Sequence, residues 1–191
     1  PWPAGGLHRL YLLAVDRAVV DGSFTVSTAV ALRGSIPPGI AAAVTDAERI
    51  KTRALDRAAY ASDASHFLFT PQAVVIAENA AEVGAILRAA SAAGNKVTFR
   101  SGGTSLSGQA ATDGVLIDVR KGFRQIDVLD GGARVRSQPG ATVRQVNARL
   151  ARHGFRLGPD PASEVACTIG GVVANNSSGM ACGTAQNTYR T

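Results

Sequence analysis

The residues with the clearest chemical potential form the segment RSGGTSLSGQ, residues 100–109, which directly follows a predicted strand. Gly102, Gly103 and Gly108 allow the backbone to turn sharply and to approach a ligand closely. Four hydroxyl side chains add hydrogen-bond donors, and consecutive backbone amides can form a concave site for an anion. The segment therefore predicts a loop that binds a diphosphate group. The competing interpretation is an ordinary polar surface loop.

A second segment rich in small residues covers residues 158–183, with the sequence GPDPASEVACTIGGVVANNSSGMACG. Its residues 168–171 predict the start of a short helix with no large side chain in the first turn, so that free amides would face an anion. Residues 175–178 add two amide and two hydroxyl side chains. Two such surfaces, far apart in the sequence, predict one long, flat ligand that lies between them.

Familiar nucleotide motifs do not fit the first segment. Residues 103–108 have the glycine spacing of a P-loop, but Gln109 and Ala110 stand where that motif requires Lys and Ser or Thr. The dinucleotide fingerprint GxGxxG is absent, and the loop precedes a predicted strand instead of opening a helix. NTP hydrolysis and a nicotinamide-binding Rossmann domain are therefore both disfavoured.

Titratable side chains offer little support for other chemistries. The three histidines, at positions 8, 66 and 153, are too far apart in sequence to indicate a metal site. Carboxylates are sparse in residues 158–183, which gives a paired-carboxylate hydrolase no support. Cys167 and Cys182 lack the spacing of a metal site or a disulfide framework, so we expect two free thiols.

Composition and charge narrow the class of protein. The 191 residues fit one large domain or two small ones, and 46% of them are hydrophobic, which excludes a disordered chain. With 34 alanines, 21 glycines and only 5% aromatics, the core must be built from small aliphatic side chains. The net charge of +6 comes from basic residues that look scattered, which favours a solvated surface and a small anionic ligand. A nucleic-acid-binding protein would rest on this charge alone and is disfavoured.

The elements that must position the first loop form a strand–helix–strand pattern. Residues 73–77 predict a buried strand, and residues 96–100 return as a second strand parallel to it. Between them, Asn79 caps a helix with Glu82 as its capping-box partner, and Gly94 ends it. The apolar face of this helix is predicted to hold Val83, Ile86, Leu87 and Ala90. Residues 115–119 predict a further buried strand.

The part between the two chemical segments predicts a hairpin and a helix. Residues 125–130 and 133–138 alternate around a turn at Asp130, Gly131 and Gly132. A helix follows, with Thr142 as the cap, Gln145 as its capping-box partner and Gly154 as the stop; its apolar face holds Val143, Val146 and Leu150.

The first 60 residues are less informative. A helix is expected over residues 7–20, a turn or linker at residues 36–39, and a weakly patterned helix within residues 46–60. In the last of these, Ile50, Leu55 and Ala58 are the expected core positions.

Five ordered motifs together resemble one family. Residues 71–75, 100–109, 138–143, 158–163 and 168–179 are similar to the FAD-linked oxidases and dehydrogenases whose FAD domain is of the p-cresol methylhydroxylase, or vanillyl-alcohol oxidase, type. Within this family the sequence most resembles D-lactate and D-2-hydroxyglutarate dehydrogenases, including long bacterial forms with an iron–sulfur part. The resemblance implies an α+β fold of two α+β subdomains.

The same resemblance implies the domain limits. The FAD-binding domain would cover residues 55–191, with its second subdomain incomplete at the C-terminus, and residues 1–54 would be an N-terminal lead-in. Relatives continue into a substrate-binding cap, so we expect the catalytic residues, and any metal or iron–sulfur cluster, only beyond Thr191.

The resemblance also implies which residues contact FAD. The first loop would cradle the diphosphate, and the later segments would line the flavin and the ribityl chain. The residues implied are Arg100, Ser101, Gly102, Gly103, Thr104, Ser105, Gly108, Gln109, Pro139, Gly140, Pro159, Asp160, Pro161, Ser163, Thr168, Gly170, Gly171, Asn175, Ser177 and Gly179. Some relatives attach the flavin through a His in the first loop; residues 101–109 contain none, so FAD is expected to bind non-covalently.

The implied reaction is oxidation of a D-2-hydroxy acid, with hydride transfer from its C2 to flavin N5 and formation of a 2-oxo acid. The partner is then a small-molecule substrate, with an unspecified electron acceptor, no nucleic acid and no membrane span. The implied location is the cytoplasm or the inner face of the membrane. The alternative is a non-catalytic flavin- or nucleotide-binding module, or a truncated inactive product.

Overall fold

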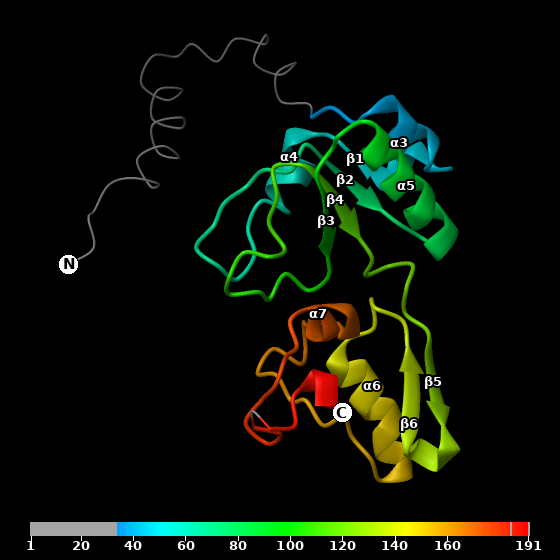
Figure 1. Cartoon of the computed structure of the whole chain (residues 1–191), viewed down its shortest axis with the longest axis vertical. Helices are drawn as coiled ribbons and strands as arrows, with labels where there is room; N and C mark the ends of the chain where they lie inside the picture. The colour runs from blue at the N-terminus through cyan, green and yellow to red at the C-terminus, as the bar shows by residue number, and fades with distance from the viewer. Residues whose placement is uncertain (1–33, 184, 191) are drawn as a thin grey trace, which may run out of the picture. The chain divides into compact units, whose positions relative to one another are not determined.

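The computed structural model describes residues 34–183 and 185–190, which belong to one unit of the chain, residues 34–191 (Figure 1). The helix predicted over residues 7–20 lies outside the described residues. Within the unit, mixed helices and strands build two sheets, one of four strands and one of two. The fold is therefore of the α+β class, as the sequence predicted.

The first sheet has the strand order β1-β2-β4-β3, and the first loop, residues 100–109, follows one of its strands. Its strands are β1 (Ile50–Lys51), β2 (Ala73–Ile76), β3 (Val97–Arg100) and β4 (Val115–Asp118). Strands β2 and β3 both pair in parallel with β4, whereas β1 is antiparallel to β2. The register places Arg100 opposite Asp118, so the loop after β3 starts at the carboxyl edge of the sheet, where β4 also ends.

Burial of β2 and β4 explains why the sequence folds this way. All four residues of each strand are buried, as expected for a β-branched run in the middle of a parallel sheet. Helices α3 (Pro38–Ala42) and α5 (Ala80–Ala92) lie beside each other next to this sheet, and their Ile40 and Ile86 join Val75 and Ile117 in one hydrophobic cluster (Figure 1).

Helix α5 begins and ends as predicted, but its cap is only half a capping box. The Asn79 carboxamide oxygen accepts the backbone N–H of Glu82 at 2.9 Å, and Gly94 adopts φ +64° after the last turn. The Glu82 carboxylate instead accepts the N–H of Glu78 at 2.8 Å and two bonds of 2.7 Å from the Arg49 guanidinium. This nearly buried ion pair connects the 3₁₀ helix Ala47–Arg49 to the start of α5.

The ion pair predicts a pH-dependent stability. The hydrogen bond from Arg49 lowers the pKa of Glu82, against the opposing effect of burial. Because the pKa of Glu82 is lower in the native state than in the unfolded state, where it is near 4.3, the ion pair stabilises the fold at pH values above about 4.3. This stabilisation is lost as the pH falls through the native pKa of Glu82. Glu82→Gln should therefore lower the free energy of unfolding by roughly 3 kcal/mol at pH 7. In urea denaturation, the difference in unfolding free energy between wild type and Glu82→Gln should be smaller at pH 3 than at pH 7. An equal difference at both pH values would contradict a stabilising ion pair between Arg49 and Glu82.

Several predictions for the first 60 residues and for α5 are wrong. Pro38 opens helix α3 where a turn was expected, because proline suits the first helical position. Instead of one helix over residues 46–60, the chain forms a 3₁₀ turn, strand β1 and helix α4 (Ala54–Ala58), since Ile50 pairs with Val75 at the sheet edge. Leu55 is 79% exposed, and Leu87 and Ala58 are exposed as well, because no element within residues 34–183 covers those helix faces.

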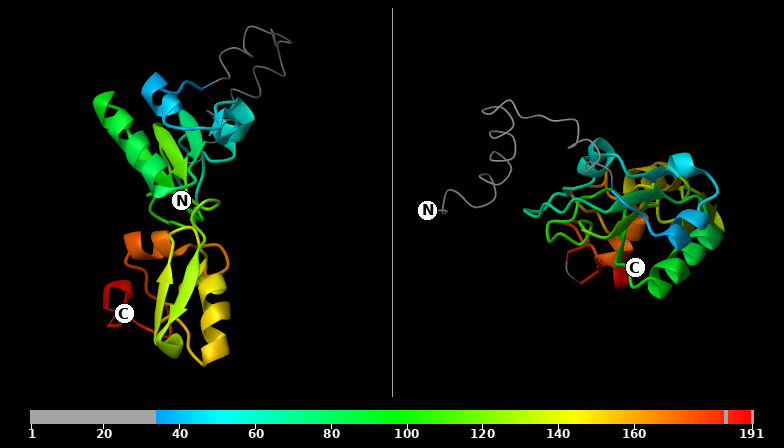
Figure 2. Two further views of the ribbon diagram at one scale, coloured as in Figure 1. Left: turned by 90° about the vertical axis from the view of Figure 1, so that its right-hand side faces the viewer. Right: turned by 90° about the horizontal axis from the view of Figure 1, so that it is seen from above.

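The second sheet and its helix agree with prediction. Strands β5 (Ile126–Leu129) and β6 (Arg134–Ser137) pair antiparallel around Asp130–Gly132, where both glycines have positive φ. Helix α6 (Val143–Leu150) begins with a complete capping box and lies beside the hairpin (Figure 2). The C-terminal part adds α7 (Ile169–Ala174) and a 3₁₀ helix at Thr188–Arg190. None of the helices in the described ranges is long and apolar enough to cross a membrane.

Candidate functional site

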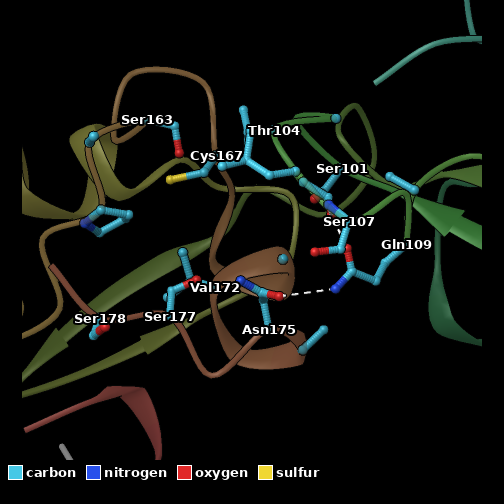
Figure 3. A pocket seen from close by; sticks show the side chains of 18 of the residues that line it. Ser101, Thr104, Ser107, Gln109, Ser163, Cys167, Val172, Asn175, Ser177 and Ser178 are labelled. Carbon is cyan, nitrogen blue, oxygen red and sulfur yellow. Dashed lines mark hydrogen bonds between the residues drawn. The ribbon is translucent and has the colours of Figure 1, made fainter. Parts of the chain in front are cut away.

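The two chemical segments line one cavity of about 800 Å³ (Figure 3). Residues 99–110 form one wall, and residues 160–180 form the other. The predicted site residues that line it are Ser101, Gly103, Thr104, Ser105, Gln109, Asp160, Pro161, Ser163, Gly171, Asn175, Ser177 and Gly179. The structure therefore brings both predicted segments together around one cavity.

The first wall presents backbone amides. Gly103 and Gly108 adopt φ values of +67° and +79°, which favour glycine. Among the described residues, none accepts a hydrogen bond from the backbone N–H groups of residues 102–105. A run of consecutive unpaired amides is the arrangement that binds phosphate oxygens in loops of this kind.

Arg100 shapes this wall from behind. The residue is 8% exposed and does not line the cavity. Its guanidinium donates to the backbone carbonyls of Ser62 at 2.7 Å, Ala110 at 3.1 Å and Tyr60 at 3.4 Å. A Cβ at Gly103 would come within 2.7 Å of the Arg100 guanidinium carbon. We infer that the Arg100 side chain positions the loop, whereas the sequence predicted a cofactor contact.

A polar cluster around the buried Asp118 adjoins Arg100. The guanidinium carbons of Arg100 and Arg120 lie 5.9 and 5.5 Å from the centre of the Tyr60 ring. The Asp118 carboxylate, 1% exposed, accepts the Tyr60 hydroxyl at 2.7 Å and the Arg120 guanidinium at 2.6 Å. Burial acts to raise the pKa of Asp118, but the hydrogen bonds from Arg120 and Tyr60 outweigh it and lower the pKa. Asp118 therefore stays ionised at neutral pH.

The second wall differs from the prediction at α7. The Ile169 and Gly170 N–H groups, expected to be free for an anion, donate to the carbonyls of Ala141 at 2.8 Å and Pro139 at 3.0 Å. A Cβ on Gly170 would lie 2.6 Å from the Pro139 Cβ, so this glycine allows α7 to pack on the segment before α6. The N-terminus of α7 is thus mostly occupied by the protein itself.

Asp160 organises the end of the second wall. Its carboxylate accepts the backbone N–H groups of Ala181 at 3.0 Å and Cys182 at 3.4 Å, and a Cβ on Gly179 would overlap Asp160. The bond from Ala181 is the largest influence that lowers the pKa of Asp160. The carboxylate therefore folds residues 179–182 against the cavity, and its oxygens are engaged by protein donors.

The two walls also touch directly. The Gln109 side-chain amide donates to the Asn175 side-chain oxygen at 3.3 Å, drawn as the dashed line in Figure 3. A Cβ on Gly102 would overlap the Ala166 carbonyl oxygen, and a Cβ on Gly171 would lie 2.8 Å from the Ser101 hydroxyl oxygen. Small residues at these positions are what bring the walls together.

Some predicted site residues do not line the cavity, and some lining residues were not predicted. Those that do not line it are Arg100, Gly102, Gly108, Pro139, Gly140, Pro159, Thr168 and Gly170. Lining residues that were not nominated are Phe99, Leu106, Ser107, Ala110, Ala162, Cys167, Val172, Ala174, Ser178 and Met180. Ser107 and Ser178 have hydroxyl groups like those of their predicted neighbours, so the same reasoning could have included them. The apolar lining residues could not be predicted, because single exposed apolar residues such as Leu106 and Met180 are common on protein surfaces.

The cysteines are free thiols, as predicted. Cys167 lines the cavity, and burial raises the pKa of its thiol, so it is a neutral wall residue at physiological pH. Within the described ranges no group of three His, Cys, Asp or Glu side chains could hold a metal ion.

The cavity fits an elongated ligand with a diphosphate. Hydroxyl and carboxamide side chains line it together with Gly103, Thr104 and Ser105, whose amides are unpaired, and the one carboxylate in the lining, Asp160, is already hydrogen-bonded to backbone amides. The Thr168 hydroxyl, next to the cavity residue Cys167, is buried without a hydrogen-bond partner among the described residues. Fold and cavity together define a domain that binds a diphosphate-containing cofactor.

The comparisons with known proteins agree. Residues 71–191 match the family described as FAD binding domain, and the chain belongs to this family. It is 34% identical to the glycolate oxidase subunit GlcD of Escherichia coli strain K12 over 175 residues. This aligned region covers 91% of this chain and 33% of GlcD. It is 32% identical over 128 residues to D-2-hydroxyglutarate dehydrogenase of Pseudomonas putida, which covers 65% of this chain and 13% of that protein.

The fold comparison supports the same family. A crystal structure of p-cresol methylhydroxylase superposes with a TM-score of 0.60 at 14% identity, over 73% of this chain and 28% of that one. The predicted p-cresol methylhydroxylase type of fold is therefore confirmed, and FAD is the cofactor of this family. The chain spans a third or less of the curated relatives it matches.

Proposed function

We propose that the chain is the FAD-binding portion of a flavin-dependent dehydrogenase that oxidises a D-2-hydroxy acid, of the D-lactate or D-2-hydroxyglutarate type. The observation that carries the proposal is the run of unpaired amides at residues 102–105, of which Gly103, Thr104 and Ser105 line a cavity whose other wall is rich in donors, in a chain of the FAD-binding family. We propose a domain that covers residues 55–191 and extends towards Gly34, because Ile40 and Val44 are buried in its core.

Within this proposal each group of residues has a distinct task. Bound FAD supplies the hydride acceptor for conversion of a 2-hydroxy acid to a 2-oxo acid. The amides of residues 102–105 and the hydroxyls of Ser101 and Thr104 bind the diphosphate, while Gln109 and Asn175 hold the two walls together. Residues 101–109 contain no histidine, which supports non-covalent binding. We assign no catalytic residue to this chain.

The substrate class is supported by the relatives. Glycolate oxidase subunit GlcD and D-2-hydroxyglutarate dehydrogenase are both named for 2-hydroxy acids, and both exceed 30% identity to this chain. Their names differ in the size of the acid, so the proposal does not choose between the D-lactate and the D-2-hydroxyglutarate type.

The proposal predicts a yellow protein. After addition of FAD and removal of free flavin, the purified chain should show a flavin absorbance spectrum, and acid precipitation should release the flavin into solution because no covalent bond holds it. A folded but colourless protein would contradict the cavity assignment. Flavin that stays in the acid pellet would contradict non-covalent binding.

The substrate is tested on a flavin-loaded protein that joins this domain to the substrate-binding part of the proposed dehydrogenase. Anaerobic addition of D-lactate or D-2-hydroxyglutarate should bleach its flavin absorbance, and the L-enantiomers serve as controls. If FAD binds and no 2-hydroxy acid bleaches it, the chain is a non-catalytic flavin-binding module instead.

A further inference from the structure

The second half of the chain contains a stretch of basic residues without acidic neighbours in the sequence. Residues 131–159 contain six arginines and no acidic residue. Strand β6 and helix α6, which lie beside each other in Figure 1, carry four of the six: Arg134, Arg136, Arg144 and Arg149. This stretch has no part in the cavity described above, which none of these arginines lines.

Three arginines meet at one hollow of about 390 Å³. Arg124 comes from the segment before β5, whereas Arg149 and Arg152 follow Gln145 and Ala148 along one face of α6 and the turn after it. Ile126, from β5, completes the lining. The lining includes no carboxylate, so three positive charges share the hollow without a counter-charge.

The two aspartates of the hairpin, Asp127 and Asp130, do not line the hollow. The Asp127 carboxylate accepts the Gln125 side-chain amide at 3.0 Å, and Asp130 pairs with Arg134. Within the described ranges Arg124, Arg149 and Arg152 make no ion pair or hydrogen bond. The helix dipole explains a cation such as Arg149 in the last turn of α6. It does not explain Arg124, which belongs to the segment before β5.

We infer that this hollow is a second ligand site, which binds a phosphate-type oxyanion. Guanidinium groups present planar pairs of donors that match phosphate oxygens, and a polyvalent anion would relieve the mutual repulsion of the three arginines. The Gln145 carboxamide offers a further donor beside them. The anion can be free or the headgroup of a lipid, because the recognised chemistry is the same. The inference does not depend on the proposed FAD chemistry.

The test is calorimetric titration of the full chain, saturated with FAD, with inorganic phosphate at constant ionic strength. Wild type should show saturable binding, and Arg124→Gln/Arg149→Gln should weaken it at least tenfold. The matched control is Arg136→Gln/Arg144→Gln, which removes the same charge from β6 and from α6 outside the hollow and should change affinity less than twofold. Equal weakening by both pairs, or no saturable binding of phosphate or vesicles, would overturn the inference.

The two sources of phosphate are separated by sedimentation with vesicles that contain phosphatidylglycerol. Binding to vesicles that only Arg124→Gln/Arg149→Gln abolishes, without binding of inorganic phosphate, identifies a lipid headgroup. Binding of inorganic phosphate alone identifies a free anion. Circular dichroism of each variant shows whether the fold is retained.

Discussion

Replacing Gly102 by alanine should abolish tight FAD binding in a chain that remains folded. The added Cβ would overlap the Ala166 carbonyl oxygen and come within 2.8 Å of its carbonyl carbon and 3.1 Å of Cys167 Cα. All three are backbone atoms, so no side-chain rotation relieves the overlap, and the two walls must separate. The amides of residues 102–105 would then lose their position opposite residues 160–180. We expect a loss in affinity of about 100-fold, or about 2.7 kcal/mol, measured by fluorescence titration with FAD.

A second glycine supplies the control. In the middle of α5, a Cβ at Gly84 would lie 3.5 Å from the nearest atom, the end of the Arg88 side chain. Gly84→Ala should leave FAD affinity unchanged and raise the free energy of unfolding by about 0.5–1 kcal/mol, since alanine favours helices. Unchanged FAD affinity in folded Gly102→Ala protein would show that the close approach of the walls is unnecessary for the site.

The parts of the fold that the sequence predicts are those determined by local chemistry. Strands β2 and β4 are recognisable in the sequence as runs rich in β-branched residues. Thr142 and Gln145 form the complete capping box that their types and spacing predict. The turn at Asp130–Gly132 needs positive φ values that its glycines supply. In each case the physical cause lies within a few residues of the feature.

The predictions that fail depend on contacts between distant residues. Glu82 has the right position for a capping box, but Arg49, 33 residues earlier, takes its carboxylate. The first amides of α7 are occupied by the carbonyls of Pro139 and Ala141, which no local pattern reveals. Leu87 continues the apolar face of α5 beyond the reach of the sheet and remains 40% exposed.

In the candidate site, too, local features could be predicted from the sequence and contacts between distant residues could not. Glycine and hydroxyl patterns located both walls, because a close backbone approach and exposed donors require those residue types. They could not distinguish residues that line the cavity from residues that hold the walls in place, such as Gly170 and Arg100. That distinction rests on where each side chain points, which the packing of the two walls decides.

Arg100→Met should unfold the first loop and prevent FAD binding. The methionine would fill part of the space but leave the carbonyls of Tyr60, Ser62 and Ala110 without the donor that now joins them. Because the Arg100 side chain is nearly buried and its three hydrogen bonds are lost together, we expect a loss in unfolding free energy of roughly 3 kcal/mol. Urea denaturation measures the stability, and fluorescence titration measures FAD affinity.

The conservative variant separates the charge from the geometry. Arg100→Lys keeps a cation beside Tyr60 but replaces a planar fork of donors by a single ammonium group, which is too compact to reach three carbonyls at once. If Arg100 positions the loop, Arg100→Lys should recover most of the stability lost in Arg100→Met yet bind FAD at least tenfold more weakly than wild type. Arg53→Met, which removes a guanidinium whose side chain is 70% exposed, serves as the control and should change neither quantity. Wild-type FAD affinity in Arg100→Lys would instead mean that a buried positive charge suffices, and that the shape of the loop is fixed by its glycines and by the contact with Ala166.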